Sequence, residues 1–179
     1  MRILFVCTGN TCRSYMAESI LKELTDDPPS DDRLPKGDFK ISSAGLFAVE
    51  GDEANEEAEK ALKKLYGIEN EKHKARQLTE EMTEESDLIF TMEESQKHAI
   101  LDCYPEAEGK VFSLKEFALG QQGEDGEEDM DDPLGGNKID VEDPYGGDLE
   151  NYMECAQEIM ELLKLSLKKL GRFEKRTQD

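Results

Sequence analysis

A cysteine and an arginine separated by five residues are the most chemically suggestive feature of the sequence. They belong to the segment Cys7-Thr-Gly-Asn-Thr-Cys-Arg13-Ser14, which directly follows a short apolar run. A thiolate is a strong nucleophile, and a guanidinium can hold two phosphate oxygens through parallel hydrogen bonds. The spacing therefore favours covalent phosphate chemistry, with Cys7 as nucleophile and Arg13 as clamp.

The residues around this pair are expected to form a phosphate-binding loop. When a loop joins a strand to a helix, its backbone N–H groups can converge on an anion, and the helix N-terminus adds partial positive charge. The same field favours ionisation of a thiol, so Cys7 is expected to be a thiolate, stabilised by a hydrogen bond from Ser14. The expected phosphate contacts are Thr8, Gly9, Asn10, Thr11, Cys12 and Ser14.

The cysteines could also have roles other than catalysis. The chain contains only four, Cys7, Cys12, Cys103 and Cys155, and their scattered positions do not suggest a disulfide framework. No further Cys or His lies at ligand spacing from the first two, so no metal and no cofactor are expected. Cys12 has two open interpretations, a reversible disulfide with Cys7 under oxidation or simple packing.

Alternating strand and helix patterns predict an α/β fold with a parallel sheet covered by helices. A buried strand precedes the loop, and helical spacing of apolar residues follows it. Loops are predicted at 26–37 and, as a mobile acidic insertion, at 121–132. The predicted strands are 2–7, 39–44, 87–91 and 110–114, and the predicted helices include 55–66, 93–104 and 149–170, with a frayed end at 172–179.

Bulk properties restrict the classes of function. The 179 residues fit a single domain, 1–179. The formal net charge of −21 argues against nonspecific nucleic-acid binding, which needs clustered Lys and Arg. The longest apolar run, Ile3 to Cys7, is too short to cross a membrane or to act as a signal peptide, so we expect a cytoplasmic protein.

The sequence resembles the low-molecular-weight protein tyrosine phosphatases over nearly its whole length. The shared motifs are Val6 to Ser14, Met16 to Glu18, Ser42 to Gly45, His73 to Gln77, Ser86 to Ile89 and Asp143 to Tyr145. The resemblance implies a three-layer fold with a four-stranded parallel sheet, a phosphocysteine intermediate and phosphorylated protein substrates. It also implies that Asn10 is held through Ser43 and His73.

The chain departs from the family pattern at two places. Tyr15 stands where the family usually has Pro, which is preorganised for a first helical turn, so the start of the helix could be looser. The acidic insertion after Gly120 is the second departure.

Two Asp-Pro motifs compete as the source of a general acid, which must protonate the leaving group. Asp143 is followed by Pro-Tyr145-Gly-Gly, and Asp132 by Pro-Leu-Gly-Gly. Only the first motif has an aromatic residue to line a substrate pocket, and it precedes the last helix as the family requires. Asp143 is therefore favoured, although an Asp-Pro pair can also simply make a turn.

Thr11 indicates which phosphorylated side chain is the substrate. Tyrosine phosphatases of this family usually have a bulky aliphatic residue at this position, whereas Thr resembles the protein arginine phosphatase branch, as does the Gly146-Gly147 pair. A hydroxyl gives a polar wall suited to a guanidinium, and phosphoarginine is favoured over phosphotyrosine. Arsenate reduction and non-enzymatic phosphate binding are weaker alternatives, and the sequence leaves the oligomeric state open.

Overall fold

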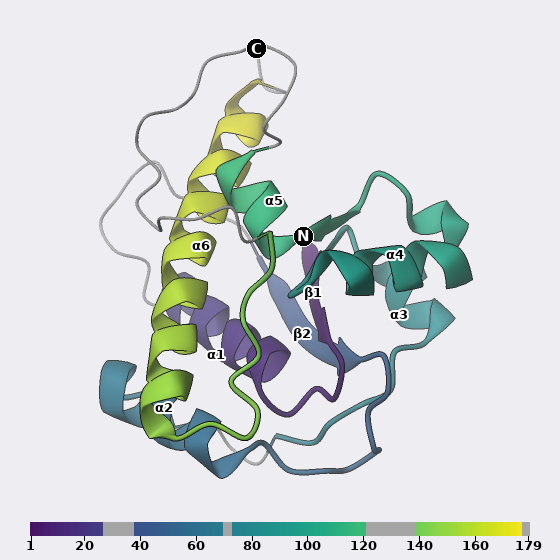
Figure 1. Ribbon diagram of the computed structural model, residues 1–179. Coiled ribbons are helices and arrows are strands. Elements are labelled where there is room, and N and C mark those ends of the chain that lie inside the picture. The colour runs from purple at the N-terminus through teal and green to yellow at the C-terminus, as the bar shows by residue number, and fades with distance from the viewer. Residues whose placement is uncertain (27–37, 70–72, 121–138, 177–179) are drawn as a thin grey trace.

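The protein is built on a four-stranded sheet in which all neighbouring strands are parallel (Figure 1). The computed structural model describes residues 1–26, 38–69, 73–120 and 139–176, with backbone only for 171–176. The strand order is β2-β1-β3-β4. The strands are β1 (Arg2–Cys7), β2 (Lys40–Gly45), β3 (Leu88–Thr91) and β4 (Val111–Ser113), which confirms the predicted four-stranded parallel sheet.

Helices cover both faces of this sheet, as Figure 1 shows. The side chains of β1 alternate, so Ile3 and Phe5 join one buried cluster, whereas Leu4 and Val6 join the other. The first cluster packs under α1 (Arg13–Asp26), α2 (Glu56–Tyr66), α5 (Leu114–Leu119) and α6 (Leu149–Arg176). The second packs under α3 (Glu80–Glu85), α4 (Glu94–Cys103) and the 3₁₀ turn η1 (Pro105–Ala107). The predicted three-layer α/β fold is therefore confirmed.

The larger core is held by aromatic contacts and by the long last helix. Phe90 on β3 stacks on Phe5 of β1 with ring centroids 5.7 Å apart and meets Phe117 of α5 edge-on at 5.0 Å. Tyr152, Ile159 and other residues of α6 are fully buried in the same cluster. Among the described helices, none has an apolar stretch long enough to cross a bilayer.

The structure adds elements that the apolar periodicity did not predict. Helices α3 and α5 have six residues each, too few to show a helical repeat. Their caps were nevertheless visible in the sequence, since Thr79 caps α3 and Ser113 forms a capping box with Glu116 in α5. The last helix also continues to Arg176, so residues 172–176 are helical rather than frayed. Most of the predicted loop at 26–37, and the acidic insertion at 121–132, lie outside the described residues.

Candidate functional site

The phosphate-binding loop predicted from the sequence lies at the carboxyl end of the central strand. Cys7 is the last residue of β1 and Arg13 the first of α1, so the five residues between them turn at the N-terminus of a helix. Ligands of open parallel sheets bind at this edge, because the strand ends and helix N-termini meet there. The fold therefore gives the Cys-x5-Arg segment the surroundings that an anion site needs.

Cys7 is buried and faces a hydroxyl group. Cys7 is only 3% exposed, and its Sγ atom lies 3.0 Å from Oγ of Ser14. A serine hydroxyl can donate to a thiolate, and in doing so it favours the ionised form. The contact agrees with the interaction predicted between these two residues.

Asn10 fixes the shape of the loop. It is fully buried and adopts φ 59°, a left-handed conformation that Asn tolerates better than most residues. Its Nδ2 group donates to Oγ of Ser14 at 3.0 Å and to Oγ of Ser43 at 2.8 Å. Its Oδ1 accepts from the backbone N–H of Arg76 at 2.9 Å. Every polar atom of this side chain is thus used to hold one strained backbone position.

His73 holds the same residue from the backbone side. Its Nε2 lies 2.7 Å from the carbonyl oxygen of Asn10. Because a carbonyl only accepts, Nε2 is the protonated ring nitrogen. Burial lowers the pKa of His73, although the hydrogen bond to Asn10 and the charge of Glu18 oppose this shift. The structure thus places both Ser43 and His73 against Asn10, and it gives His73 a positioning contact.

The end of β2 passes so close to the loop that only glycine fits. A Cβ at Gly45 would lie 2.7 Å from the carbonyl oxygen of Thr8. The next two residues bond to the loop directly, since the N–H of Leu46 donates to Cys7 and that of Phe47 to Thr8, both at 2.9 Å. Gly45 belongs to the Ser-Ser-Ala-Gly motif, and the structure explains its presence there as steric.

Arg13 lies against two carboxylates and a backbone carbonyl. It is 2% exposed; Nη1 lies 2.6 Å from Oε1 of Glu93 and 3.0 Å from the carbonyl of Val141, and Nη2 lies 2.8 Å from Oδ2 of Asp143. Burial alone would lower the pKa of Arg13, but these carboxylates raise it. Glu93 was not predicted as a site residue; its signal was a charged side chain just past the end of β3.

Asp143 and Tyr145 project from the segment before α6. The N–H of Val141 donates to Met92 at 2.8 Å, which ties this segment to the end of β3. Oδ1 of Asp143 accepts from the backbone N–H of Tyr145 at 3.2 Å, as in an Asx turn. The Tyr145 side chain is 75% exposed. The structure thus brings Asp143 to Arg13, whereas Asp132 lies outside the described residues.

The remaining loop residues are held by their neighbours. Cys12 is buried, and its Sγ lies 3.5 Å from Oη of Tyr152 and 3.6 Å from Oγ1 of Thr11. Burial raises the pKa of Cys12, with weaker opposing effects from these two hydroxyls. Cys7 and Cys12 are both free thiols, and the possibility of a disulfide between them stays a hypothesis. Thr8 Oγ1 accepts from Gln96 at 3.3 Å.

Tyr15 has a packing role in place of proline. Its side chain is 3% exposed, and its ring lies 4.7 Å from that of His73 at an interplanar angle of 48°. Helix α1 begins at Arg13 despite the missing proline. The substitution therefore braces the histidine that contacts Asn10.

Comparisons with known proteins show which family the chain belongs to. A family model described as "Low molecular weight phosphotyrosine protein phosphatase" matches residues 2–176. A protein-arginine-phosphatase of Geobacillus stearothermophilus is 36% identical over 169 residues, covering 94% of this chain and 95% of that protein. The solved YwlE arginine phosphatase from the same organism superimposes with a TM-score of 0.77 at 34% identity, covering 98% of this chain and 96% of the other.

A second similar structure is named as a tyrosine phosphatase instead of an arginine phosphatase. The low molecular weight protein tyrosine phosphatase from T. tengcongensis superimposes on this chain with a TM-score of 0.77 at 40% identity. The match covers 94% of this chain and 99% of the T. tengcongensis protein. The family model spans almost the whole chain, and each of these relatives matches at least 94% of the chain. The chain therefore belongs to the low-molecular-weight phosphotyrosine protein phosphatase family, whose members are cysteine-based phosphatases.

Proposed function

We propose that this phosphatase removes phosphate from phosphorylated arginine side chains of proteins, through a phosphocysteine formed on Cys7. The loop geometry supports a phosphate bound beyond β1, within reach of the loop N–H groups and the Arg13 guanidinium. The relatives named as arginine phosphatases support the choice of leaving group. On this chain itself, Thr11 is the single observation that supports phosphoarginine as the substrate.

In the first step the thiolate of Cys7 attacks phosphorus, and the bond from phosphorus to the guanidine nitrogen breaks. Asp143 contacts Arg13, so its carboxyl group would lie next to any phosphate that Arg13 holds. A protonated Asp143 would give its proton to the leaving nitrogen, so that arginine departs without a negative charge. The side chain is about half exposed and therefore accessible to solvent protons.

In the second step water attacks the phosphocysteine. The Asp143 carboxylate accepts a proton from that water, the phosphorus–sulfur bond breaks, and inorganic phosphate leaves. The hydroxyl of Ser14 stabilises the departing thiolate, because it lies 3.0 Å from Sγ. Cys7 is thereby regenerated and the cycle is closed.

Thr11 supports the arginine substrate through its position and its polarity. The residue is half-buried on the loop, and its carbonyl accepts from the N–H of Asn55, the N-cap of α2, at 2.9 Å. The backbone at this position is therefore fixed. A hydroxyl there would offer an oxygen to the substrate, and a guanidinium is planar and rich in N–H donors, unlike a phenyl ring.

Phosphotyrosine is the second candidate, and exposed aromatic residues favour it. Phe47 is 78% exposed and follows β2, where its N–H bonds to the loop, and Tyr145 is 75% exposed beyond Asp143. Aromatic side chains of this kind can pack on a phenyl ring.

A comparison of two matched phosphopeptides tests the proposal. They differ only in carrying phosphoarginine or phosphotyrosine at one position, and kcat/KM is measured for each. We expect a preference of at least about tenfold for phosphoarginine. The opposite preference would assign the phosphotyrosine activity instead. If the enzyme hydrolysed p-nitrophenyl phosphate but neither phosphopeptide, both proposed substrates would be contradicted.

A further inference from the structure

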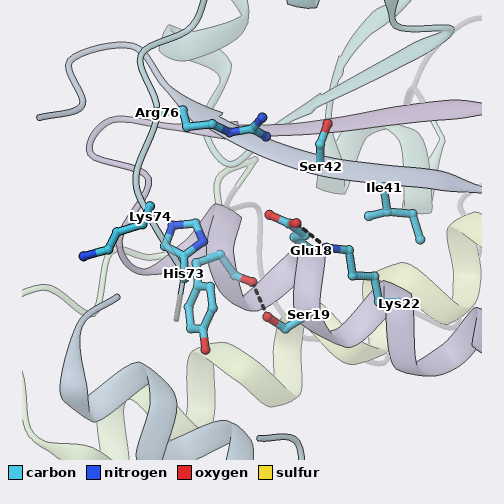
Figure 2. Close-up of a pocket in the computed structure, with 9 residues that line it drawn as sticks. Glu18, Ser19, Lys22, Ile41, Ser42, His73, Lys74 and Arg76 are labelled. Carbon is cyan, nitrogen blue, oxygen red and sulfur yellow. Dashed lines mark hydrogen bonds and ion pairs between the residues drawn. The ribbon is translucent and has the colours of Figure 1, made fainter. Parts of the chain in front are cut away.

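A polar pocket lies behind the phosphate loop, between α1, β2 and the segment 73–76. Its volume is about 550 Å³. Figure 2 shows Glu18 and Lys22 on α1 near Ser42 of β2, with His73 and Arg76 alongside. The lining contains none of the residues from Cys7 to Ser14, although it shares Tyr15, His73 and Arg76 with the surroundings of the loop.

The lining of this pocket has an excess of positive charge. Lys22, Lys74 and Arg76 contribute three cations; Lys22 pairs with Glu18 of the lining and Lys74 pairs with Glu53, which leaves one net positive charge. Burial lowers the pKa of His73, which favours its neutral form. The whole chain has a net charge of −21, so the net charge of this lining is opposite in sign to that of the chain. A hollow lined by one sign of charge concentrates ions of the other sign.

One wall of the pocket is connected to the phosphate loop by hydrogen bonds from α1. Lys22 pairs with Glu18, and the other carboxylate oxygen of Glu18 accepts a short hydrogen bond from the hydroxyl of Ser43. The Ser43 oxygen in turn accepts from Nδ2 of Asn10 at 2.8 Å. A change at Lys22 therefore reaches the strained loop residue through two intervening side chains.

The opposite wall holds the same residue directly. His73 contacts the carbonyl of Asn10, the N–H of Arg76 donates to its side chain, and the Arg76 guanidinium donates to the carbonyl of Ser43 at 2.9 Å. Both walls of the pocket thus stabilise the left-handed conformation of Asn10 on which the loop depends. A ligand that orders these walls would therefore also favour this conformation of the loop.

We propose that this pocket binds a small polyanion with carboxylate or phosphate groups, and that its occupation tightens phosphate binding at the loop. The cations supply the charge and Ser42 a hydroxyl donor. Linkage requires that the polyanion and the active-site phosphate raise each other's affinity by the same factor. The proposal does not depend on whether the substrate is phosphoarginine.

Citrate and inorganic pyrophosphate, added separately at constant ionic strength, test the binding. Backbone amide NMR of the full chain should show saturable shifts at Lys22, Ser42 and Lys74. The two probes distinguish carboxylate from phosphate ligands. With citrate, the KM for p-nitrophenyl phosphate should fall about fivefold, at the lower end of typical coupling between sites.

A pair of double variants controls for charge. Lys22→Gln with Lys74→Gln should weaken anion binding at least about tenfold, because charge-assisted hydrogen bonds are lost. The matched control is Lys60→Gln with Lys164→Gln, exposed lysines on α2 and α6 that pair with carboxylates of their own helices. This control removes the same charge and should leave the affinity unchanged.

Four outcomes would overturn the proposal, the last of them by removing the coupling. The first is the absence of saturable shifts with either anion, and the second is equal weakening in the two double variants. The third is a set of shifts confined to residues 8–13 with competitive inhibition, which would place the anion in the catalytic loop. Binding at the pocket without a change in KM would overturn the coupling. A failure of the phosphoarginine proposal would alter none of these readouts.

Discussion

Replacement of Asn10 by alanine tests whether the hydrogen bonds around this residue create the phosphate site. The change removes three hydrogen bonds, to Ser14, Ser43 and the N–H of Arg76. Each is worth about 1 kcal/mol. Alanine at φ 59° adds about 1 kcal/mol of backbone strain.

The total of about 4 kcal/mol corresponds to about 10³-fold if all of it appears in the loop. We therefore expect vanadate affinity and kcat/KM for p-nitrophenyl phosphate to fall by about 10²–10³-fold, while circular dichroism still reports an α/β fold. The buried core of both clusters is untouched by the change. The assay is a steady-state titration with vanadate as inhibitor.

Asn10→Gly is the matched control. It loses the same hydrogen bonds but relieves the left-handed strain, so it should exceed the alanine variant by about fivefold in vanadate affinity. A glycine variant no better than alanine would refute the strain argument. An alanine variant within about threefold of wild type would refute the whole account, because the hydrogen bonds would then contribute less than about 1 kcal/mol.

Four further predictions concern single residues. Cys7→Ser should abolish turnover while retaining phosphate binding, since its hydroxyl is not ionised; activity above about a hundredth of wild type would contradict it. Asp143→Asn should slow hydrolysis of an ester with a poor leaving group by about 10²–10⁴-fold, and Asp132→Asn should have almost no effect; the reverse pattern would exchange their roles. Thr11→Ile should shift the rate ratio from phosphoarginine toward phosphotyrosine by about 10–200-fold and keep p-nitrophenyl phosphate turnover within about tenfold; an unchanged ratio would remove the main support for arginine. The pKa of His73 is lowered in the folded protein, so just below pH 6.5 the unfolded chain binds a proton at this residue more readily than the folded chain does. The melting temperature should therefore fall as the pH drops below 6.5, and it should fall by less in His73→Gln.

The sequence alone predicted cysteine-based phosphatase chemistry, which the family match confirms, because the proposed reacting groups lie close together along the chain. Cys7 and Arg13 are separated by five residues at a junction between a strand and a helix. Their relation depends on local geometry, so a motif can predict it. The four strands were also predictable, since β1, β3 and β4 are short apolar runs, β2 ends at Gly45, and all four alternate with helical segments.

Residue spacing alone could not show which distant residues surround that loop: the family resemblance suggested Ser43, His73 and Asp143, and the tertiary structure added Glu93. Glu93 and Asp143 meet Arg13 because the ends of β3 and of the segment before α6 converge on it, and no sequence spacing encodes that convergence. Likewise the pocket behind Asn10 joins α1, β2 and the segment 73–76. A local motif can predict the reacting atoms, whereas contacts between residues 33 to 130 positions apart depend on how the elements pack.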